Sequence, residues 1–281
     1  MKIITADERL AERSGVKALI VGPSGIGKTT LLRTLSAEML AETLLIDVEA
    51  GELAVRDLTG LASIRPRTWS DCVNIACAIG GPNPALPATS IYSEAHHAEI
   101  LKDPVFASLA AYKIFFVDSV TAASRLSFIA AEQAPEAFSD RGRKDLRAVY
   151  GVHARSMLAW LGQLQHARES TVIFLAVLEK DTDSFGVSSW QPQIEGSKVP
   201  REIPAIVDQI VTYQLVDFGD RKPVRAFVCT NPNAWGYPAK DRSGLLEQFE
   251  RPDLGALLEK LTRPGKRKLL TVASPEQSAQ T

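Results

Sequence analysis

The feature that most constrains the fold is the glycine-rich segment GPSGIGKTT, residues 22–30. It follows the apolar run 16–22, which predicts a buried strand, and leads into KTTLLRTLSAEML, which predicts one helix over residues 28–40. Glycine residues let a backbone wrap closely around an anion, with several N–H groups aimed at it. The segment satisfies the pattern G-x-x-x-x-G-K-[ST] in the strand, loop and helix context that this pattern requires.

The glycine-rich segment therefore predicts a site for a nucleoside triphosphate, with ATP and Mg²⁺ as the expected cofactors. Lys28 is expected to reach the β- and γ-phosphates and the Thr29 hydroxyl to ligate Mg²⁺, while the positive end of the helix adds attraction. A chance glycine turn is the alternative, and the flanking strand and helix disfavour it. The residues predicted to bind the cofactor are Gly22, Pro23, Ser24, Gly25, Ile26, Gly27, Lys28, Thr29 and Thr30.

Further apolar runs predict the rest of the fold. Apolar strands that alternate with helices favour an α/β fold, with a mostly parallel sheet flanked by helices. The last two runs are joined by DFGDRKP, which predicts an antiparallel extension at the sheet edge. The predicted strands lie at 43–49, 112–119, 170–178, 209–216 and 224–230. Loops are predicted at 80–90, 132–145 and 179–202.

Composition limits the class of protein. The 281 residues are 45% hydrophobic and 23% charged, which is ordinary for a globular domain. We predict one domain over residues 1–262 and a disordered tail, basic and then polar, over 263–281. The net charge of −1 excludes a strong overall attraction to nucleic acid, so any DNA contact needs a local patch.

The cysteines and the apolar runs bear on location. The three cysteines lack the spacing of metal ligands, which predicts reduced thiols. The charged N-terminus has no apolar signal core, and no apolar run approaches the length of a membrane span. We therefore predict a soluble cytoplasmic protein without a membrane partner.

Acidic residues at strand ends are candidates for chemistry beside the phosphates. Asp118 follows four apolar residues, so a buried strand would carry its carboxylate to the sheet edge, where it could ligate Mg²⁺. The alternative is a helix N-cap, a role that Asp and Ser both fill. Asp47 and Glu49 end the second strand and share a face. Glu49 lies nearer the carboxyl end, where ligands bind, and is the better candidate for orienting or deprotonating water; the alternative is a solvated strand end.

At these residues the sequence resembles the RecA-like ATPases. The segment LLIDVEAG is similar to the recombinase segment whose glutamate activates water, which would make Glu49 the general base. The segment FFVDSVTA is similar to the metal-binding strand, with Asp118 as the acid. One departure concerns the next strand, where recombinases carry a glutamine that couples nucleotide state to DNA. Val177 or Leu178 stands at that position, and neither side chain can form hydrogen bonds. Coupling of nucleotide state to DNA would then depend on Glu179 or Lys180 instead.

The late segment AKDRSG resembles the K-x-R-x-G element of ring helicases and clock-type ATPases. In those proteins the lysine and arginine reach the γ-phosphate of the neighbouring subunit. The resemblance implies that Lys240 and Arg242 act in trans in a homo-oligomer, supplying cations to the charge on the transferred phosphoryl group. The alternative is an exposed basic turn.

A closer likeness covers residues 16–261 and lies in the order of several weak motifs. The segments PRTWSD, YSEAHH, VDSVTAAS, IPAIVDQIV and AKDRSGLLEQFERPDL together resemble phage-encoded AAA-type ATP-binding proteins. Some of these accompany single-strand annealing proteins. The resemblance implies an ATPase of phage-type DNA recombination or repair, in the host cytoplasm, with single-stranded DNA or an annealing protein as partner. The alternative is a nucleotide-switched accessory protein with little or no hydrolysis.

Two stretches could form a surface for nucleic acid. DRGRKDLR holds four cations against two acids, and the predicted loop 179–202 offers aromatic rings for stacking and cations for phosphates. A solvated charged face is the alternative. The candidate residues are Arg141, Arg143, Lys144 and Arg147, beside Asp140 and Asp145, together with Phe185, Trp190, Lys198 and Arg201.

Overall fold

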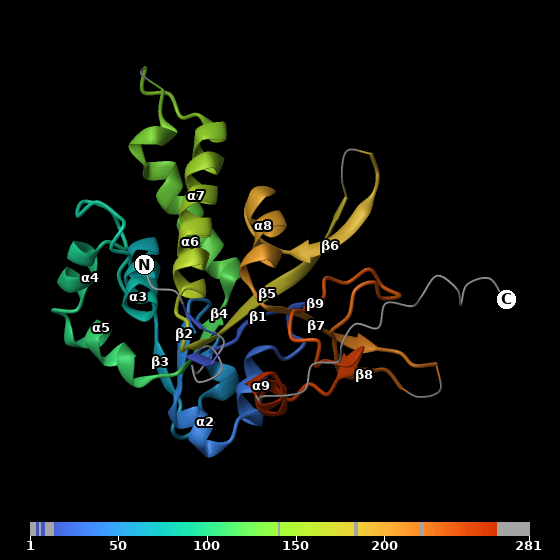
Figure 1. Ribbon diagram of the computed structural model, residues 1–281. Helices are drawn as coiled ribbons and strands as arrows, with labels where there is room; N and C mark the ends of the chain where they lie inside the picture. Colours follow the sequence, from blue (N-terminus) through green and yellow to red (C-terminus); the bar gives the residue numbers. More distant parts are fainter. Residues whose placement is uncertain are drawn as a thin grey trace.

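The computed structural model describes residues 4–5, 7–8, 14–139, 141–182, 185–219 and 222–262 (Figure 1). The predicted tail 263–281 and Asp140 lie outside these residues. The strands are β1 (Lys17–Gly22), β2 (Thr43–Asp47), β3 (Ala62–Ile64), β4 (Ile114–Asp118), β5 (Thr171–Thr182), β6 (Ser188–Pro192), β7 (Gln209–Val216), β8 (Val224–Val228), β9 (Lys240–Asp241) and β10 (Phe249–Glu250).

The sheet confirms the predicted mostly parallel α/β fold. Its strand order is β10-β8-β7-β1-β5-β4-β2-β3, and all neighbours from β7 to β3 run parallel. β8 and β10 are antiparallel and form the predicted edge extension. Because β1, β2 and β4 run in the same direction, the glycine-rich loop, Asp47 and Asp118 all lie at the carboxyl edge of the sheet.

Helices cover both faces of the sheet, because alternate residues of each buried strand point to opposite faces. On β1, for example, Leu19 and Val21 belong to one core cluster, with α3, α6, α7 and α8, while Ala18 and Ile20 belong to another, with α2 and α9. The helices are α2 (Ala37–Ala41), α3 (Trp69–Gly80), α4 (Glu94–Ile100), α5 (Pro104–Ser108), α6 (Val120–Gln133), α7 (Leu146–Gln165), α8 (Lys198–Ile206) and α9 (Leu254–Thr262), with 3₁₀ turns at Thr29–Thr34, Glu52–Val55, Leu109–Ala111 and Pro135–Ala137.

The prediction of one helix over residues 28–40 is wrong. A six-residue 3₁₀ helix, Thr29–Thr34, follows the loop, and α2 begins only at Ala37. Leu35 between them is extended, and the Ser36 hydroxyl caps α2 by accepting a hydrogen bond from the amide of Met39. The serine thus favours a new helix start over continuation of the first. Attraction from a long helix therefore contributes less to the loop than the sequence suggested.

The prediction of a long loop over residues 179–202 is also wrong. β5 continues to Thr182 and pairs with β6, from Leu178 opposite Pro192 to Thr182 opposite Ser188, and α8 begins at Lys198. The outer part of this hairpin is exposed on both faces, so its sequence lacks the alternation by which a half-buried strand is recognised. Figure 1 shows the hairpin extending from the body on the same side as α6 and α7.

Two further sequence predictions concern the cysteines and the apolar runs. Cys72, Cys77 and Cys229 are buried and form no disulfide, in line with reduced thiols. Within the part of the chain that the structure describes, no helix combines the length and the apolar character needed to cross a bilayer.

We expect alanine at two glycine positions to change stability in opposite directions. A Cβ on Gly15 would lie 2.0 Å from the Ser170 carbonyl oxygen, so Gly15→Ala should lower the free energy of unfolding by more than about 2 kcal/mol. A Cβ on Gly162, within α7, would meet no atom within 4 Å, so Gly162→Ala should raise it by about 0.5–1 kcal/mol. Urea unfolding measures both values, and a stable Gly15→Ala variant would contradict the tight approach of the segments that precede β1 and β5.

Candidate nucleotide-binding site

The loop between β1 and the first 3₁₀ helix needs its glycines for two different reasons. Gly25 and Gly27 have φ values of 76° and 105°, in the left-handed region that favours glycine. A Cβ on Gly22 would lie 2.5 Å from the carbonyl oxygen of Tyr213 on β7. The loop is therefore held against the sheet and folded as tightly as close wrapping of an anion requires.

Lys28 lies over this loop with its amine desolvated. The residue is 9% exposed, and its Nζ donates hydrogen bonds to the carbonyl oxygens of Gly22 at 3.0 Å and Pro23 at 3.1 Å. Burial lowers the pKa of Lys28, and the negative charges of Asp118 and Glu49 act in the opposite direction. The lysine and the two acids therefore lie close enough to affect one another's charge. A phosphate would be a stronger hydrogen-bond acceptor for the lysine than the two carbonyl oxygens are.

Thr29 and Asp118 form the pair expected of a magnesium site. The Thr29 hydroxyl donates a hydrogen bond of 2.5 Å to Oδ2 of Asp118, which is 3% exposed at the end of β4. Burial raises the pKa of Asp118 to about 6; the bond from Thr29 lowers it, while Glu49 and Asp47 raise it further. A buried carboxylate among other acids beside a hydroxyl is a set of hard oxygen ligands that a divalent cation would stabilise. The residues therefore fit Mg²⁺.

The neighbouring serine answers the question of a helix cap. Ser119, not Asp118, is the N-cap of α6, because its hydroxyl accepts a hydrogen bond from the Ala122 amide at 3.2 Å. The Asp118 carboxylate is thus left to face Thr29. The N-cap alternative for Asp118 is wrong.

The two acids at the end of β2, Asp47 and Glu49, lie in different environments. Asp47 is buried, its Oδ1 accepts a hydrogen bond from the Gly51 amide at 2.8 Å, and burial raises its pKa. Glu49 is exposed, and its Oε2 accepts a hydrogen bond from the Ser119 hydroxyl at 2.9 Å. The amides of Val48 and Glu49 donate to the Asp118 carbonyl oxygen at 2.7 and 3.0 Å. Asp47 therefore shapes the turn, while Glu49 stands beside the candidate metal ligands with access to water.

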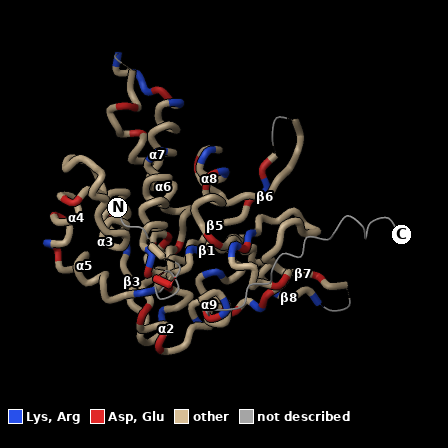
Figure 2. The backbone as a smooth tube through the Cα atoms, in the orientation of Figure 1, with Lys and Arg blue, Asp and Glu red and all other residues tan. Residues whose placement is uncertain are grey.

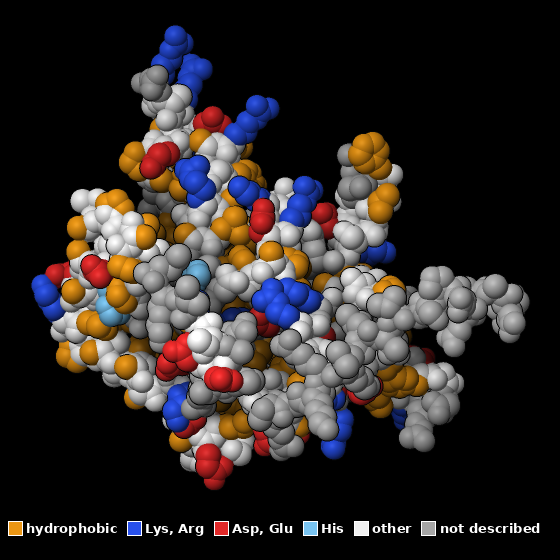
Figure 3. Space-filling view, in the orientation of Figure 1, with side chains coloured by type: hydrophobic (Ala, Val, Ile, Leu, Met, Phe, Trp, Pro, Cys, Tyr) orange, Lys and Arg blue, Asp and Glu red, His pale blue; other side chains and the backbone are white. Residues whose placement is uncertain are grey.

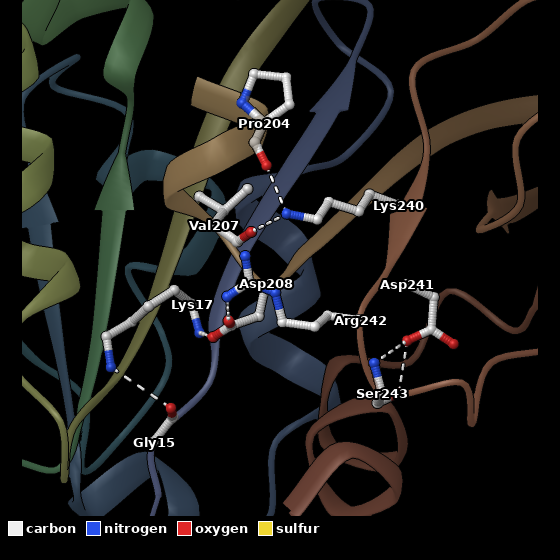
Figure 4. Close-up of polar contacts among 9 residues, drawn as sticks. All are labelled: Gly15, Lys17, Pro204, Val207, Asp208, Lys240, Asp241, Arg242 and Ser243. Carbon is white, nitrogen blue, oxygen red and sulfur yellow. Dashed lines mark hydrogen bonds and ion pairs between the residues drawn. The ribbon is translucent and has the colours of Figure 1, made fainter. Parts of the chain in front are cut away.

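Lys240 and Arg242 lie at the amino ends of the parallel strands, whereas the glycine-rich loop of the same chain follows the carboxyl end of β1. Figure 4 shows the polar contacts of both side chains. β9 pairs with the start of β7, with Lys240 opposite Ile210, and β7 runs parallel to β1. The Lys240 amine donates to the carbonyl oxygens of Pro204 at 2.5 Å and Val207 at 2.8 Å, at the end of α8.

The guanidinium of Arg242 has a different partner. It donates to Oδ1 of Asp208 at 2.7 Å, and its side chain is 52% exposed. Asp208 also accepts a hydrogen bond from the Lys17 amide, which ties the arginine to the start of β1 (Figure 4). Neither cation contacts the loop of its own chain.

At the position on β5 where recombinases carry a glutamine, the structure shows a contact that the sequence analysis did not predict. Val177 lies opposite Gly22, and its amide donates to the Thr121 hydroxyl at 3.0 Å, while Leu178 is buried in the core. No polar side chain replaces the absent glutamine at these two positions, but the Thr121 hydroxyl of α6 contacts the strand there. The pattern VDSVT contains both Ser119 and Thr121, yet only the cap that Ser119 forms can be inferred from it.

The loop, Lys28, and the Thr29–Asp118 pair at the carboxyl edge of a mostly parallel sheet define a P-loop domain of α/β fold. Residues 14–243 match the model of a family described as AAA domain, and the chain belongs to that family. Among curated proteins, no sequence matches the chain.

The comparison with solved structures finds several distant similarities. An ATPase from the type III secretion system of pathogenic bacteria is 17% identical over 72% of this chain and 51% of its own, with a TM-score of 0.39, so the chain spans about half its length. The RadB recombinase is 14% identical over 77% and 80%, with a TM-score of 0.37. The flagellar accessory protein FlaH from Methanocaldococcus jannaschii is 11% identical over 87% and 90%, with a TM-score of 0.36. Likenesses this distant place no residue and no activity on this chain.

We expect Asp118→Asn to stabilise the nucleotide-free protein while removing its response to Mg²⁺. Because the folded-state pKa is raised from 3.8 to about 6, the ionised carboxylate costs stability above about pH 6, and that cost disappears as the pH falls toward 3.8. At pH 7.5 the variant should gain on the order of 2 kcal/mol or less in free energy of unfolding. The gain should shrink at pH 4.

Thermal unfolding with and without Mg²⁺ and ATP measures this difference. Glu99→Gln, which changes an exposed acid on α4, is the control and should alter stability by less than about 0.5 kcal/mol at either pH. A less stable Asp118→Asn variant at pH 7.5 would contradict the assigned cost of burial.

Proposed function

We propose that the protein hydrolyses ATP. The observation that carries the proposal is the exposed Glu49 carboxylate beside the Thr29–Asp118 pair and the P-loop lysine. Lys28 and the loop amides bind the triphosphate, and Thr29 with Asp118 holds Mg²⁺, which when bound neutralises charge on the phosphate oxygens. Glu49 accepts a proton from water as the water oxygen bonds to the γ-phosphorus. The bond from that phosphorus to the bridging oxygen breaks, and ADP and phosphate result.

The position of Lys240 and Arg242 supports an assembly in which neighbouring copies complete the site. Both cations lie at the edge of the sheet opposite their own loop. A head-to-tail contact brings opposite edges of two copies together, which is what cations acting in trans require. Arg242 is half exposed and is held by one ion pair to Asp208, so it can exchange this partner for a phosphate.

We further propose that single-stranded DNA is a partner, in phage-type recombination or repair. Cations gather at the end of the α6–α7 projection, where Arg141, Arg143 and Arg147 are exposed (Figure 2). Hydrophobic atoms mark the end of the β5–β6 hairpin, where Phe185 is 90% exposed (Figure 3). A cationic and an aromatic projection suit phosphates and bases respectively.

Two residues of the predicted nucleic-acid surface have partners within the chain. Lys144 forms an ion pair with Glu132, with a nitrogen–oxygen distance of 2.7 Å. The Trp190 ring packs against Tyr237, with ring centroids 5.4 Å apart. The exposed arginines Arg141, Arg143 and Arg147 are therefore better candidates for phosphate contact than Lys144.

A second candidate function uses the same nucleotide site. It is that of a nucleotide-switched accessory protein with little or no hydrolysis. The observation in its favour is the apolar pair Val177 and Leu178 where recombinases carry a coupling glutamine. Turnover measured with and without single-stranded DNA decides between the two functions, because the accessory protein would bind ATP without turnover.

Mixing two inactive variants tests action in trans. Lys28→Ala should lose ATP binding, whereas Arg242→Ala should bind ATP and lose turnover by about 10³-fold. In an equimolar mixture about a quarter of the interfaces join an intact loop to an intact arginine, so about a quarter of native turnover should return.

The controls for this experiment use concentration and another arginine. Arg168→Ala, at an exposed position before β5, should keep native turnover. Native specific activity should rise with protein concentration. A mixture that stays inactive, or an activity independent of concentration, would reject the trans role of Arg242.

Salt dependence tests the proposed DNA surface. Arg141→Gln and Arg143→Gln should each weaken binding to single-stranded DNA and reduce the slope of log affinity against log salt by about 0.7. Phe185→Ala should weaken binding without changing the slope. Lys102→Gln, at an exposed position after α4, should change neither. Equal effects of Lys102→Gln and the arginine variants would contradict a local surface.

A further inference from the structure

The side chain of Ser119 connects the candidate general base to the buried framework of the protein. Ser119 is fully buried, yet its hydroxyl donates to Oε2 of the exposed Glu49 at 2.9 Å. The same oxygen accepts the Ala122 amide at 3.2 Å, which fixes the direction of the hydroxyl. A flexible, solvated carboxylate is thus tied at one oxygen to a rigid group.

The helix that carries Ser119 is itself fixed by further buried hydroxyls. The Thr121 hydroxyl accepts the Val177 amide at 3.0 Å, and the Ser124 hydroxyl accepts the Glu195 amide at 2.9 Å. These bonds join the start of α6 to β5 and to the segment before α8. Ser119 therefore cannot move relative to the strands without breaking other buried hydrogen bonds, each of which would leave an unsatisfied group.

We infer that Ser119 is a positioning residue for ATP hydrolysis, acting through Glu49. Its bond to Oε2 selects one orientation of the carboxylate and leaves Oε1 to accept the proton of the attacking water. Without the hydroxyl, an exposed glutamate samples several rotamers, and only a fraction of them place the base correctly. The inference rests on the proposed function, since it assigns Ser119 a task only if Glu49 is the base.

Ser93 supplies a matched control for the loss of a buried cap. It is buried, it caps α4 by accepting the His96 amide at 3.2 Å, and its hydroxyl donates to the Ala88 carbonyl at 3.2 Å. Ser93→Ala and Ser119→Ala therefore remove the same two kinds of bond from an N-cap. They differ in the acceptor of the donated bond, which is a backbone carbonyl in one case and the Glu49 carboxylate in the other.

The test is a double-mutant cycle on the full chain, with ATP turnover, ATP affinity and thermal unfolding measured for each variant. Ser119→Ala should lower kcat about tenfold without weakening ATP binding, whereas Ser93→Ala should lower thermal stability similarly and keep native kcat. Glu49→Gln should lower kcat by about a hundredfold or more. Ser119→Ala added to Glu49→Gln should lower the residual turnover no further, because the serine acts through the glutamate.

A conservative variant checks that the hydroxyl is responsible. Ser119→Thr keeps both the cap and the donor, so it should retain most of the native kcat. It also provides a measurement if Ser119→Ala does not fold.

Two results would overturn the inference. One is a Ser119→Ala kcat within about twofold of native; the other is an equal further loss when Ser119→Ala is added to Glu49→Gln, which would indicate a purely structural role. Native protein that binds ATP without turnover would reject the proposed function itself, whereas a further result would reject only the assignment of the base. If Lys28→Ala abolishes turnover while Glu49→Gln leaves it intact, Glu49 is not the base, and the failure belongs to that assignment.

Discussion

Two backbone hydrogen bonds join the end of β2 to the end of β4 and hold the site together. The amides of Val48 and Glu49 both donate to the carbonyl of Asp118, just where the two strands leave the sheet. The contact fixes the candidate base relative to the candidate metal ligand without using either side chain. Both carboxylates are therefore left for chemistry. The placement of β5 between β1 and β4 then sets the distance over which the P-loop threonine reaches Asp118.

Burial of charged groups at the site has an electrostatic cost for the folded protein. Asp118 and Asp47 are buried with raised pKa values, and Lys28 is buried with a lowered one. Opposite shifts of this kind mean that desolvation outweighs the attraction between the groups. A cation beside the acids and an anion beside the lysine would each reduce the cost, so ligand binding and folding stability are linked at this edge.

The features of the fold and the site that can be predicted are those encoded in a few adjacent residues of the sequence. The glycine-rich loop, Lys28, Thr29 and the apolar strand that ends at Asp118 are each encoded in a few adjacent residues, and the structure brings them together as expected. The break at Leu35 was missed because the apolar spacing continues through it, and only the cap by Ser36 marks a new helix. The β5–β6 hairpin was missed because both of its outer faces are exposed. The bond from Ser119 to Glu49 joins residues 70 positions apart, so no local pattern could reveal it.

The opposed placement of loop and late cations gives the molecule a direction. An assembly that joins one edge to the other has two chemically different ends unless it closes into a ring. If the cations act in trans as proposed, the terminal copy at one end keeps its own loop but receives no cations from a neighbour, and would keep its triphosphate unhydrolysed. The copy at the other end offers its arginine to no neighbour. In an open assembly, hydrolysis would thus differ along the length, and bound triphosphate would persist longest at one end.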